Sequence, residues 1–187
     1  MLEAVASLPS WVTSEVDYTQ TYVSDEERMR FVISLARGNV EHRTGGPFAA
    51  AVFERGAKGR LVSVGVNSVI RLNNSTSHAE MLAFQLAQKR LASHTLAGDG
   101  TRPEHELFTS CAPCAMCLGA TLWSGVTRIV SAATREDAES IAFDEGPVFP
   151  ESYRYLEKRG VAVVGELLRA DAQAVMGLYR RLGGEVY

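Results

Sequence analysis

Apolar positions recur with two different periods along the chain. Met29, Val32, Ile33 and Ala36 share one face, which predicts an amphipathic helix from a cap at Ser24 to about residue 39. Two continuous apolar runs, 48–53 and 61–66, flank a turn with two glycines and predict a β-hairpin buried on both faces. Later segments predict helices at about 78–92, from 113 onward, and at 135–142, 152–159 and 169–182, with strands at 106–110, 126–132 and 161–165.

Helices and strands alternate after the hairpin, so the expected class is α/β. We expect a three-layer α-β-α sandwich in which helices cover both faces of a mixed five-stranded sheet. A helical connection between the last two strands favours a parallel pair. Residues 1–187 are expected to form a single domain, since no segment has the composition of a linker. Residues 1–22 predict an irregular N-terminal arm, and residues 183–187 a short C-terminal tail.

Composition and charge narrow the class of protein. The chain has 187 residues, of which 46 % are apolar and 22 % charged, with a net charge of −3. It contains no run of Lys and Arg, which argues against a nucleic-acid partner. Its start lacks the pattern of a signal peptide, and no apolar run approaches the roughly 20 residues that span a bilayer. The cysteines all fall within 111–117, so we expect free thiols in a reducing, cytoplasmic setting.

Two short stretches carry the candidate chemistry, His78-Ala79-Glu80 and Pro113-Cys114-Ala115-Met116-Cys117. One imidazole and two thiolates suit zinc, and three protein ligands leave the fourth tetrahedral position open. Glu80 is expected to move protons beside the metal. Alone, a CxxC can be a redox pair or two buried thiols, and His-Ala-Glu opens many ordinary helices. Together they match the signature of zinc-dependent nucleobase deaminases.

A second ligand assignment exists, because Cys111-Ala112-Pro113-Cys114 is itself a CxxC. We prefer Cys114 with Cys117, since Pro113 then enters the helix just before them, whereas in the other assignment the proline lies between the ligands. Cys111 is then expected to be a small buried residue at a strand end. The other histidines lack matching ligands and are expected at the surface: His42, His94 and His105.

From about Gly45 to its end, the chain resembles the cytidine-deaminase-like zinc hydrolases and, within them, the bacterial guanine deaminases. Beyond the zinc signature, the resemblance rests on residues 46–50, 109–114 and 142–145 and on the terminal Tyr187. Two positions depart from it. Ala112 stands where Glu is usual, which changes hydrogen bonding near the metal without removing a ligand. Ala142 stands where Gly is usual, which reshapes the following loop.

The resemblance implies that one zinc ion per chain supports deamination of a purine base, converting guanine to xanthine and ammonia. Amino-triazines such as ammeline are a close alternative substrate. Further alternatives are a cytosine or nucleoside deaminase, a tRNA adenosine deaminase, which the charge disfavours, and a catalytically silent zinc-binding interaction protein. The presence of Glu80 beside the ligands disfavours the last, because a purely structural zinc site has no use for an acid–base group.

The resemblance also implies roles for residues around the metal. Glu145 is expected to join Glu80 as a catalytic carboxylate, unless it belongs to a solvated loop. Phe48 is expected to stack on the purine and Asn67 to read its edge, although a phenylalanine in an apolar run is more often core and an asparagine there can form a turn. The remaining substrate-site candidates are Ala79, Asp144, which can instead cap a turn, and Tyr187.

The end of the chain and the metal-bearing helix predict intersubunit contacts. Two glycines before the last three residues form a flexible hinge, so Tyr187 is expected to close the active site of its own or of a partner subunit. The alternative is a frayed tail. A homodimer is expected, with contacts between the metal-bearing helices through Leu118, Leu122 and Trp123. The two subunits are also expected to exchange their C-terminal segments as a possible variant.

Overall fold

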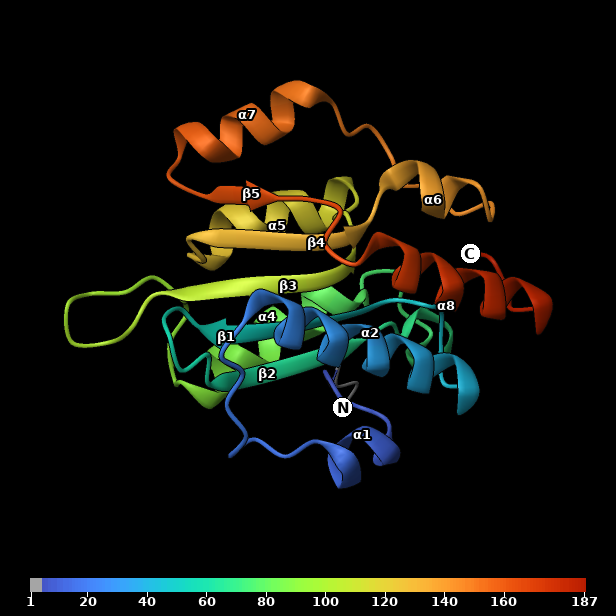
Figure 1. The fold of residues 1–187 in the computed structure, drawn as a ribbon, viewed down its shortest axis with the longest axis horizontal. Helices are drawn as coiled ribbons and strands as arrows, with labels where there is room; N and C mark the ends of the chain where they lie inside the picture. The colour runs from blue at the N-terminus through green and yellow to red at the C-terminus, as the bar shows by residue number, and fades with distance from the viewer. Residues whose placement is uncertain (1–4) are drawn as a thin grey trace.

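The computed structural model describes residues 5–187 and contains a five-stranded mixed sheet (Figure 1). The strand order is β2-β1-β3-β4-β5, with bounds β1 Ala49–Glu54, β2 Leu61–Val66, β3 His105–Cys111, β4 Arg128–Ala133 and β5 Ala162–Val164. β1 pairs antiparallel with β2 and β3, whereas β3 and β4, and β4 and β5, pair in parallel. The predicted mixed sheet with a parallel last pair is confirmed.

Helices cover both faces of this sheet, as predicted (Figure 1). One face carries two helices that pack on each other, α2 (Asp25–Glu41) and α8 (Arg169–Arg181). The other face carries α4 (Ala79–Arg90), α5 (Ala115–Ser124) and α7 (Pro150–Lys158), around a second apolar cluster. β1 and β3 are buried along almost their whole length because they lie between the two clusters.

Three short helices connect these elements. α1 (Ser10–Glu15) lies in the predicted irregular arm, of which residues 1–4 fall outside the described part, and α3 (Val69–Leu72) lies in the connection after β2. The expectation of irregular structure was wrong for residues 10–15. α1 forms although its local pattern is weak, because Trp11 and Val12 join the buried core. α6 (Arg135–Glu139) is shorter than predicted.

The residues at which α4 and α5 begin determine where two of the predicted metal ligands lie. α2 begins at its predicted cap, where Ser24 Oγ accepts a hydrogen bond from the Glu27 amide at 3.1 Å. α4 begins one residue later than predicted, since His78 occupies the N-cap position. Likewise Pro113 precedes α5 instead of entering its first turn, because Cys114 is the N-cap. In both helices the predicted ligand is therefore the N-cap residue, and its side chain at the helix N-terminus can contact a bound group.

His105 was expected at the surface and is instead 2 % exposed. It begins β3, all seven residues of which are buried, and its Nδ1 lies 2.7 Å from the Leu96 carbonyl oxygen. The place of this strand in the middle of the sheet therefore outweighs the polarity of the side chain. His42 and His94 are exposed, as predicted. Within residues 5–187, no helix is both long and apolar enough to cross a membrane.

Candidate active site

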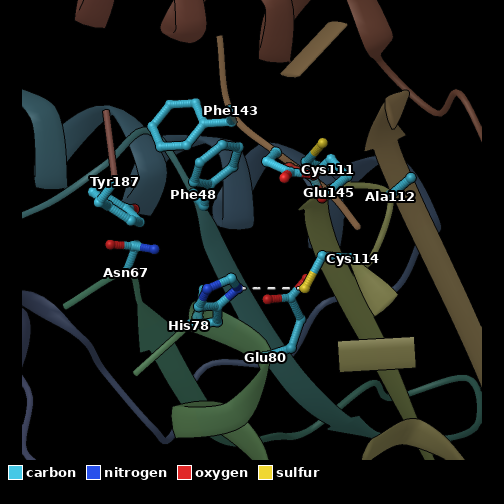
Figure 2. Close-up of a pocket in the computed structure, with 12 residues that line it drawn as sticks. Phe48, Asn67, His78, Glu80, Cys111, Ala112, Cys114, Phe143, Glu145 and Tyr187 are labelled. Atoms are coloured by element: carbon cyan, nitrogen blue, oxygen red, sulfur yellow. Dashed lines mark hydrogen bonds between the residues drawn. The ribbon is translucent and has the colours of Figure 1, made fainter. Parts of the chain in front are cut away.

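Strand ends and helix N-termini meet at one edge of the sheet (Figure 2). Phe48 precedes β1 and Asn67 follows β2. The main-chain N–H of Asn67 donates to the Phe48 carbonyl oxygen at 2.9 Å. Cys111 ends β3, which is the antiparallel neighbour of β1, so it lies beside the start of β1. α4 and α5 begin at the same edge with His78 and Cys114. The topology therefore gathers residues from distant parts of the chain around one space.

The three predicted metal ligands converge there. His78 Nδ1 lies 3.5 Å from Cys114 Sγ and 3.7 Å from Cys117 Sγ, and all three atoms lie within 4.8 Å of one another. A tetrahedral zinc ion with Zn–N near 2.0 Å and Zn–S near 2.3 Å requires an N···S separation of about 3.6 Å. The spacing and the donor set of one imidazole and two sulfurs therefore fit a zinc ion.

The alternative pairing of Cys111 with Cys114 does not agree with the geometry. The Cys111 thiol donates to the Thr134 carbonyl oxygen at 3.4 Å, so it faces away from the ligand group. The atoms that lie within 4.8 Å of one another are those of His78, Cys114 and Cys117. Cys111 is the small buried residue at a strand end that its position predicted.

Glu80 lies beside the ligand atoms. Its carboxylate is buried and accepts hydrogen bonds from the Thr109 hydroxyl at 3.1 Å and the Cys117 thiol at 3.3 Å. Burial, followed by the charge of Cys114, raises the pKa of Glu80 above its ordinary value. A carboxylate with a raised pKa can accept a proton and return it, which is the property that a general acid–base group needs.

A second buried carboxylate, Glu145, belongs to the loop after α6. Burial, and then the charges of Cys114 and Glu80, raise its pKa to about 8. The loop is fastened to α5, because the Ala115 amide donates to the Glu145 carbonyl at 3.0 Å. Burial thus argues against a solvated loop. Ala142 near the start of this loop has φ 75°, a conformation that costs a residue with a Cβ roughly 1–2 kcal/mol and that glycine adopts freely.

Asp144 and Ala79 also line the cavity, in different ways. Asp144 is exposed, and its carboxylate accepts a hydrogen bond from the Gly146 amide at 2.8 Å, which agrees with the turn-capping alternative. Ala79 is buried at the start of α4, where its methyl group leaves space for a ligand. The substrate-binding roles of both residues stay predictions.

Three aromatic rings form one side of the cavity (Figure 2). The Phe143 ring meets those of Phe48 and Tyr187 edge-on, with centroids 4.9 Å and 5.2 Å apart. Such T-shaped contacts fix the orientation of each ring. Phe143 was not predicted as a site residue. Its place in the sequence, between two motif residues, could have indicated a site residue. Its apolar side chain, however, is equally typical of a residue in the hydrophobic core.

Tyr187 packs into the cavity of its own chain. It keeps 36 % of its surface exposed, yet its hydroxyl group is enclosed, since a Cβ built on Gly46 would lie 2.6 Å from it. Burial raises the pKa of Tyr187 well above its ordinary value, and a hydrogen bond with Asn67 opposes that shift. This arrangement disagrees with a frayed tail.

The cavity between these residues has a volume of about 60 Å³. This space exceeds the roughly 10–15 Å³ that one water molecule needs, so the cavity can admit a ligand. Every predicted site residue apart from Cys117 lines the cavity, and Cys117 contributes its sulfur to the ligand group. The lining also includes three residues not predicted to be there: Cys111, Ala112 and Phe143.

The surface predicted to mediate dimer contacts is only partly exposed. Trp123 is 84 % exposed, but Leu118 is 6 % exposed, so the expectation that α5 presents Leu118 to solvent was wrong. Leu118 packs inward with the second apolar cluster. It still lines, with Leu122 and the half-exposed Tyr155 of α7, a surface cavity of about 470 Å³. Exposed aromatic rings beside an apolar hollow are typical of interaction surfaces.

Known proteins share both the sequence and the fold. Residues 23–133, which contain Glu80 and all three ligands, match the cytidine and deoxycytidylate deaminase zinc-binding region. Guanine deaminase of Bacillus subtilis (strain 168) is 32 % identical over 139 residues, covering 74 % of this chain and 83 % of that protein. Guanine deaminase from Nitrosomonas europaea superposes with a TM-score of 0.87 at 42 % identity, covering 97 % of each chain. NE0047 in complex with 2,6-diaminopurine gives 0.88 at 43 % identity, covering 97 % of this chain and 94 % of that one.

Proposed function

The chain belongs to the cytidine and deoxycytidylate deaminase zinc-binding family, and we propose that it catalyses the zinc-dependent hydrolysis of guanine to xanthine and ammonia. One observation carries this proposal: a zinc-ligand triad, two buried carboxylates and an amide line one small cavity. Similarity to guanine deaminases over almost the whole chain supports guanine as the base.

The first proton transfers are assigned to Glu80. His78, Cys114 and Cys117 hold the zinc ion, which when bound supplies a Lewis acid that makes a nucleophile of water at neutral pH. Glu80 would accept a proton from that water, because its carboxylate lies beside the ligand group, 3.3 Å from the Cys117 sulfur. As the new carbon–oxygen bond forms at C2 of guanine, Glu80 delivers the proton to the adjacent ring nitrogen.

The last proton transfers are assigned to Glu145. The amino nitrogen is protonated, its bond to C2 breaks and it leaves as ammonia, and the new hydroxyl group on C2 returns a proton to Glu145 as it becomes the carbonyl group of xanthine. Glu145 is buried on the side of the cavity away from Glu80 and is fastened to α5 through its carbonyl group (Figure 2). It can therefore hold a proton close to the departing amine.

Asn67 and Phe48 are assigned to the base itself. The Asn67 amide can donate and accept hydrogen bonds at once, which suits the edge of a purine. The Phe48 ring is held edge-on by Phe143, so a face remains for a flat base. Together they orient C2 towards the metal ligands, and Ala79 and Asp144 complete the walls.

Tyr187 is assigned the role of a lid. Its ring packs on Phe143, and the Tyr179 hydroxyl donates to the Glu185 carbonyl at 2.6 Å, which ties down the tail. A closed lid keeps out water that competes with the activated nucleophile. Deleting residues 185–187 should lower guanine turnover without changing zinc content. A truncated enzyme with full activity would show that the tail is no lid.

We also assign the chain to a cytoplasmic homodimer. Its free thiols favour a reducing compartment. Leu122 and Tyr155 line an apolar hollow that a second copy can cover, and Trp123, next to Leu122 on α5, is exposed. The C-terminal tail packs into its own chain in this structure, and an exchange in which it makes these contacts with the second subunit is part of this proposal. Sedimentation at micromolar concentration should yield a dimer that Trp123→Asp weakens. A wild-type monomer would refute it.

Ammonia release tests the function directly. Guanine, cytosine, cytidine, ammeline and a tRNA anticodon stem should be compared, with product analysis for xanthine and with Glu80→Gln as the inactive control. Guanine should have the highest kcat/KM. A higher value for ammeline would identify a triazine enzyme, and turnover of cytosine or cytidine without guanine would replace the proposal by the pyrimidine alternative.

A further inference from the structure

A line of hydrogen bonds connects the N-terminal helix α1 to the substrate cavity. Trp11 Nε1 donates to Thr44 Oγ1 at 3.0 Å, and the Thr44 hydroxyl donates to Asn39 Oδ1 at 2.7 Å. Asn39 Nδ2 then donates to two main-chain carbonyl oxygens, those of Gly46 at 2.8 Å and Asn67 at 2.9 Å. Trp11, Thr44 and Asn39 themselves do not line the cavity.

The chemistry of each group in this line determines whether it donates or accepts each hydrogen bond. An indole nitrogen carries a hydrogen and cannot accept, so the Thr44 oxygen accepts from Trp11. Of the two acceptors within reach of its single proton, Asn39 Oδ1 at 2.7 Å is closer than the Asn39 main-chain carbonyl oxygen at 3.4 Å. The Asn39 amide is thereby oriented, with its oxygen towards Thr44 and its nitrogen towards the two carbonyl groups. A reversed amide would set oxygen against oxygen at both carbonyl contacts.

Burial and close packing make this arrangement costly to change. Asn39 is fully buried and Asn67 is 1 % exposed. A Cβ built on Gly45 would lie 1.9 Å from the Asn67 carbonyl oxygen and 2.8 Å from Asn39 Nδ2, so glycine is needed at that position. A buried carbonyl group that loses its donor is left without water to replace it. The Asn67 main chain therefore depends on the Asn39 amide.

We propose that Trp11, Thr44 and Asn39 are positioning residues that set the base preference of the cavity by orienting Asn67. Both polar main-chain atoms of Asn67 are held, its amide by the Phe48 carbonyl at 2.9 Å and its carbonyl by Asn39 at 2.9 Å. The Asn67 side chain lines the cavity, and its Oδ1 accepts a hydrogen bond from the Val69 amide at 3.4 Å, so its direction depends on where the main chain at 67–69 is held. The inference rests on the proposed function, because Asn67 is assigned there to the edge of the base.

Thr44→Val tests the relay, since valine keeps the size of threonine and removes the hydroxyl group. The KM for guanine should rise about tenfold, the scale of one lost buried hydrogen bond, while kcat changes little. The ratio of kcat/KM for guanine to that for 2,6-diaminopurine should fall, and zinc content should stay at the wild-type level. Trp11→Phe, which removes only the N–H donor, should shift KM in the same direction by a smaller factor.

Thr13→Val is the matched control. It makes the same chemical change on α1, where the Thr13 hydroxyl donates to the Ser10 carbonyl at the surface, 2.7 Å away. It should leave KM and the base ratio unchanged. If Thr44→Val instead lowers the melting temperature while KM and the ratio stay at wild-type values, Thr44 is merely structural and the proposal is wrong.

A double-mutant cycle shows whether the effect passes through Asn67. Once Asn67→Ala has removed the amide, adding Thr44→Val should change KM by less than about twofold, because the relay has nothing left to orient. Independent, multiplying effects of the two substitutions would overturn the proposal and leave the guanine deaminase function intact. A wild-type enzyme that does not turn over guanine would overturn that function and, with it, this inference.

Discussion

Strand β3 buries charge at both of its ends, and the two ends are neutralised differently. At the N-terminal end, Glu106 is 1 % exposed and accepts from Arg28 at 2.7 Å and from Arg128 at 2.8 Å. Asp25 pairs with the same two arginines. Two carboxylates thus face two guanidinium groups, and the chain itself supplies each counter-charge. This cluster is complete without a ligand.

At the C-terminal end of β3, roughly 16 Å away along the strand, the balance between acidic and basic groups is different. Glu80, Glu145 and two cysteine sulfurs face a single imidazole, that of His78. Burial raises the pKa of both carboxyl groups. Because buried negative charge is costly without a partner, these groups either keep their protons or need a cation from outside the chain. A self-neutralised buried cluster thus indicates a structural role, and an excess of one sign indicates a binding site.

The largest expected effect comes from removing a ligand at the incomplete end. Cys117→Ser should abolish zinc binding and turnover, because a neutral hydroxyl group cannot replace a thiolate ligand. Elemental analysis of the purified protein measures the metal content. Cys111→Ser should keep its zinc, as its sulfur contacts Thr134 rather than the ligand group. The opposite pattern would mean that Cys111 and Cys114 are the ligands.

Glu80→Gln should leave the charge cluster able to bind zinc but remove its acid–base group. Loss of such a group costs about 10²–10⁴-fold in rate, and the upper end is expected because Glu80 serves more than one transfer. The measurement is kcat for guanine together with zinc content. Near-normal turnover by a zinc-loaded variant would disprove the assigned mechanism.

At the complete end, Glu106→Gln should affect stability and spare the chemistry. Two guanidinium groups would lose their buried anion, which lowers the free energy of unfolding by about 3–5 kcal/mol. Glu104→Gln is the matched control, since Glu104 pairs with Arg55 at the surface, 3.0 Å away, and should cost at most about 1 kcal/mol. Urea unfolding measures both, and KM below the transition should not change. Equal small losses would contradict a structural role for the cluster.

The two ends of β3 also show how far prediction from sequence reaches. The ligands and Glu80 were predicted individually, because they fall in two short stretches whose spacing is diagnostic. The cluster of ion pairs at the N-terminal end of β3 was not predicted, because Asp25 and Arg128 are 103 positions apart and no local pattern links them. Pairings of this kind depend on the register of the folded sheet, which periodicity does not specify.

The same limit explains the other errors. Hydrophobic periodicity predicted the five strands and the main helices, because those elements bury regular faces. It failed for α1, for His105 and for Phe143, whose positions depend on contacts with distant segments. The relay from Trp11 to Asn67 is of the same type. Local chemistry therefore predicted the metal site, whereas the residues that hold its surroundings required the fold.

The smallest expected effect lies at the outer edge of the structural cluster, in Asp25. A hydrogen bond from Arg128 lowers the pKa of Asp25 below its ordinary value. A carboxylate with a lowered pKa stabilises the fold above its unfolded-state pKa of about 4, and that contribution is lost as the pH falls through the folded-state pKa. Its side chain is 32 % exposed and Arg128 still keeps Glu106, so Asp25→Asn should cost at most about 1 kcal/mol at neutral pH.

The pH dependence of that small loss identifies its origin. Urea unfolding of the wild type and of Asp25→Asn should be compared between neutral pH and about pH 3, below the ordinary pKa of aspartate. Zinc release in acid affects both proteins alike and cancels in the difference. If charge is the cause, the difference shrinks as Asp25 becomes protonated in the wild type. A difference that stays constant would mean that Asp25 acts through shape and neutral hydrogen bonds, and that Glu106 alone balances the two arginines.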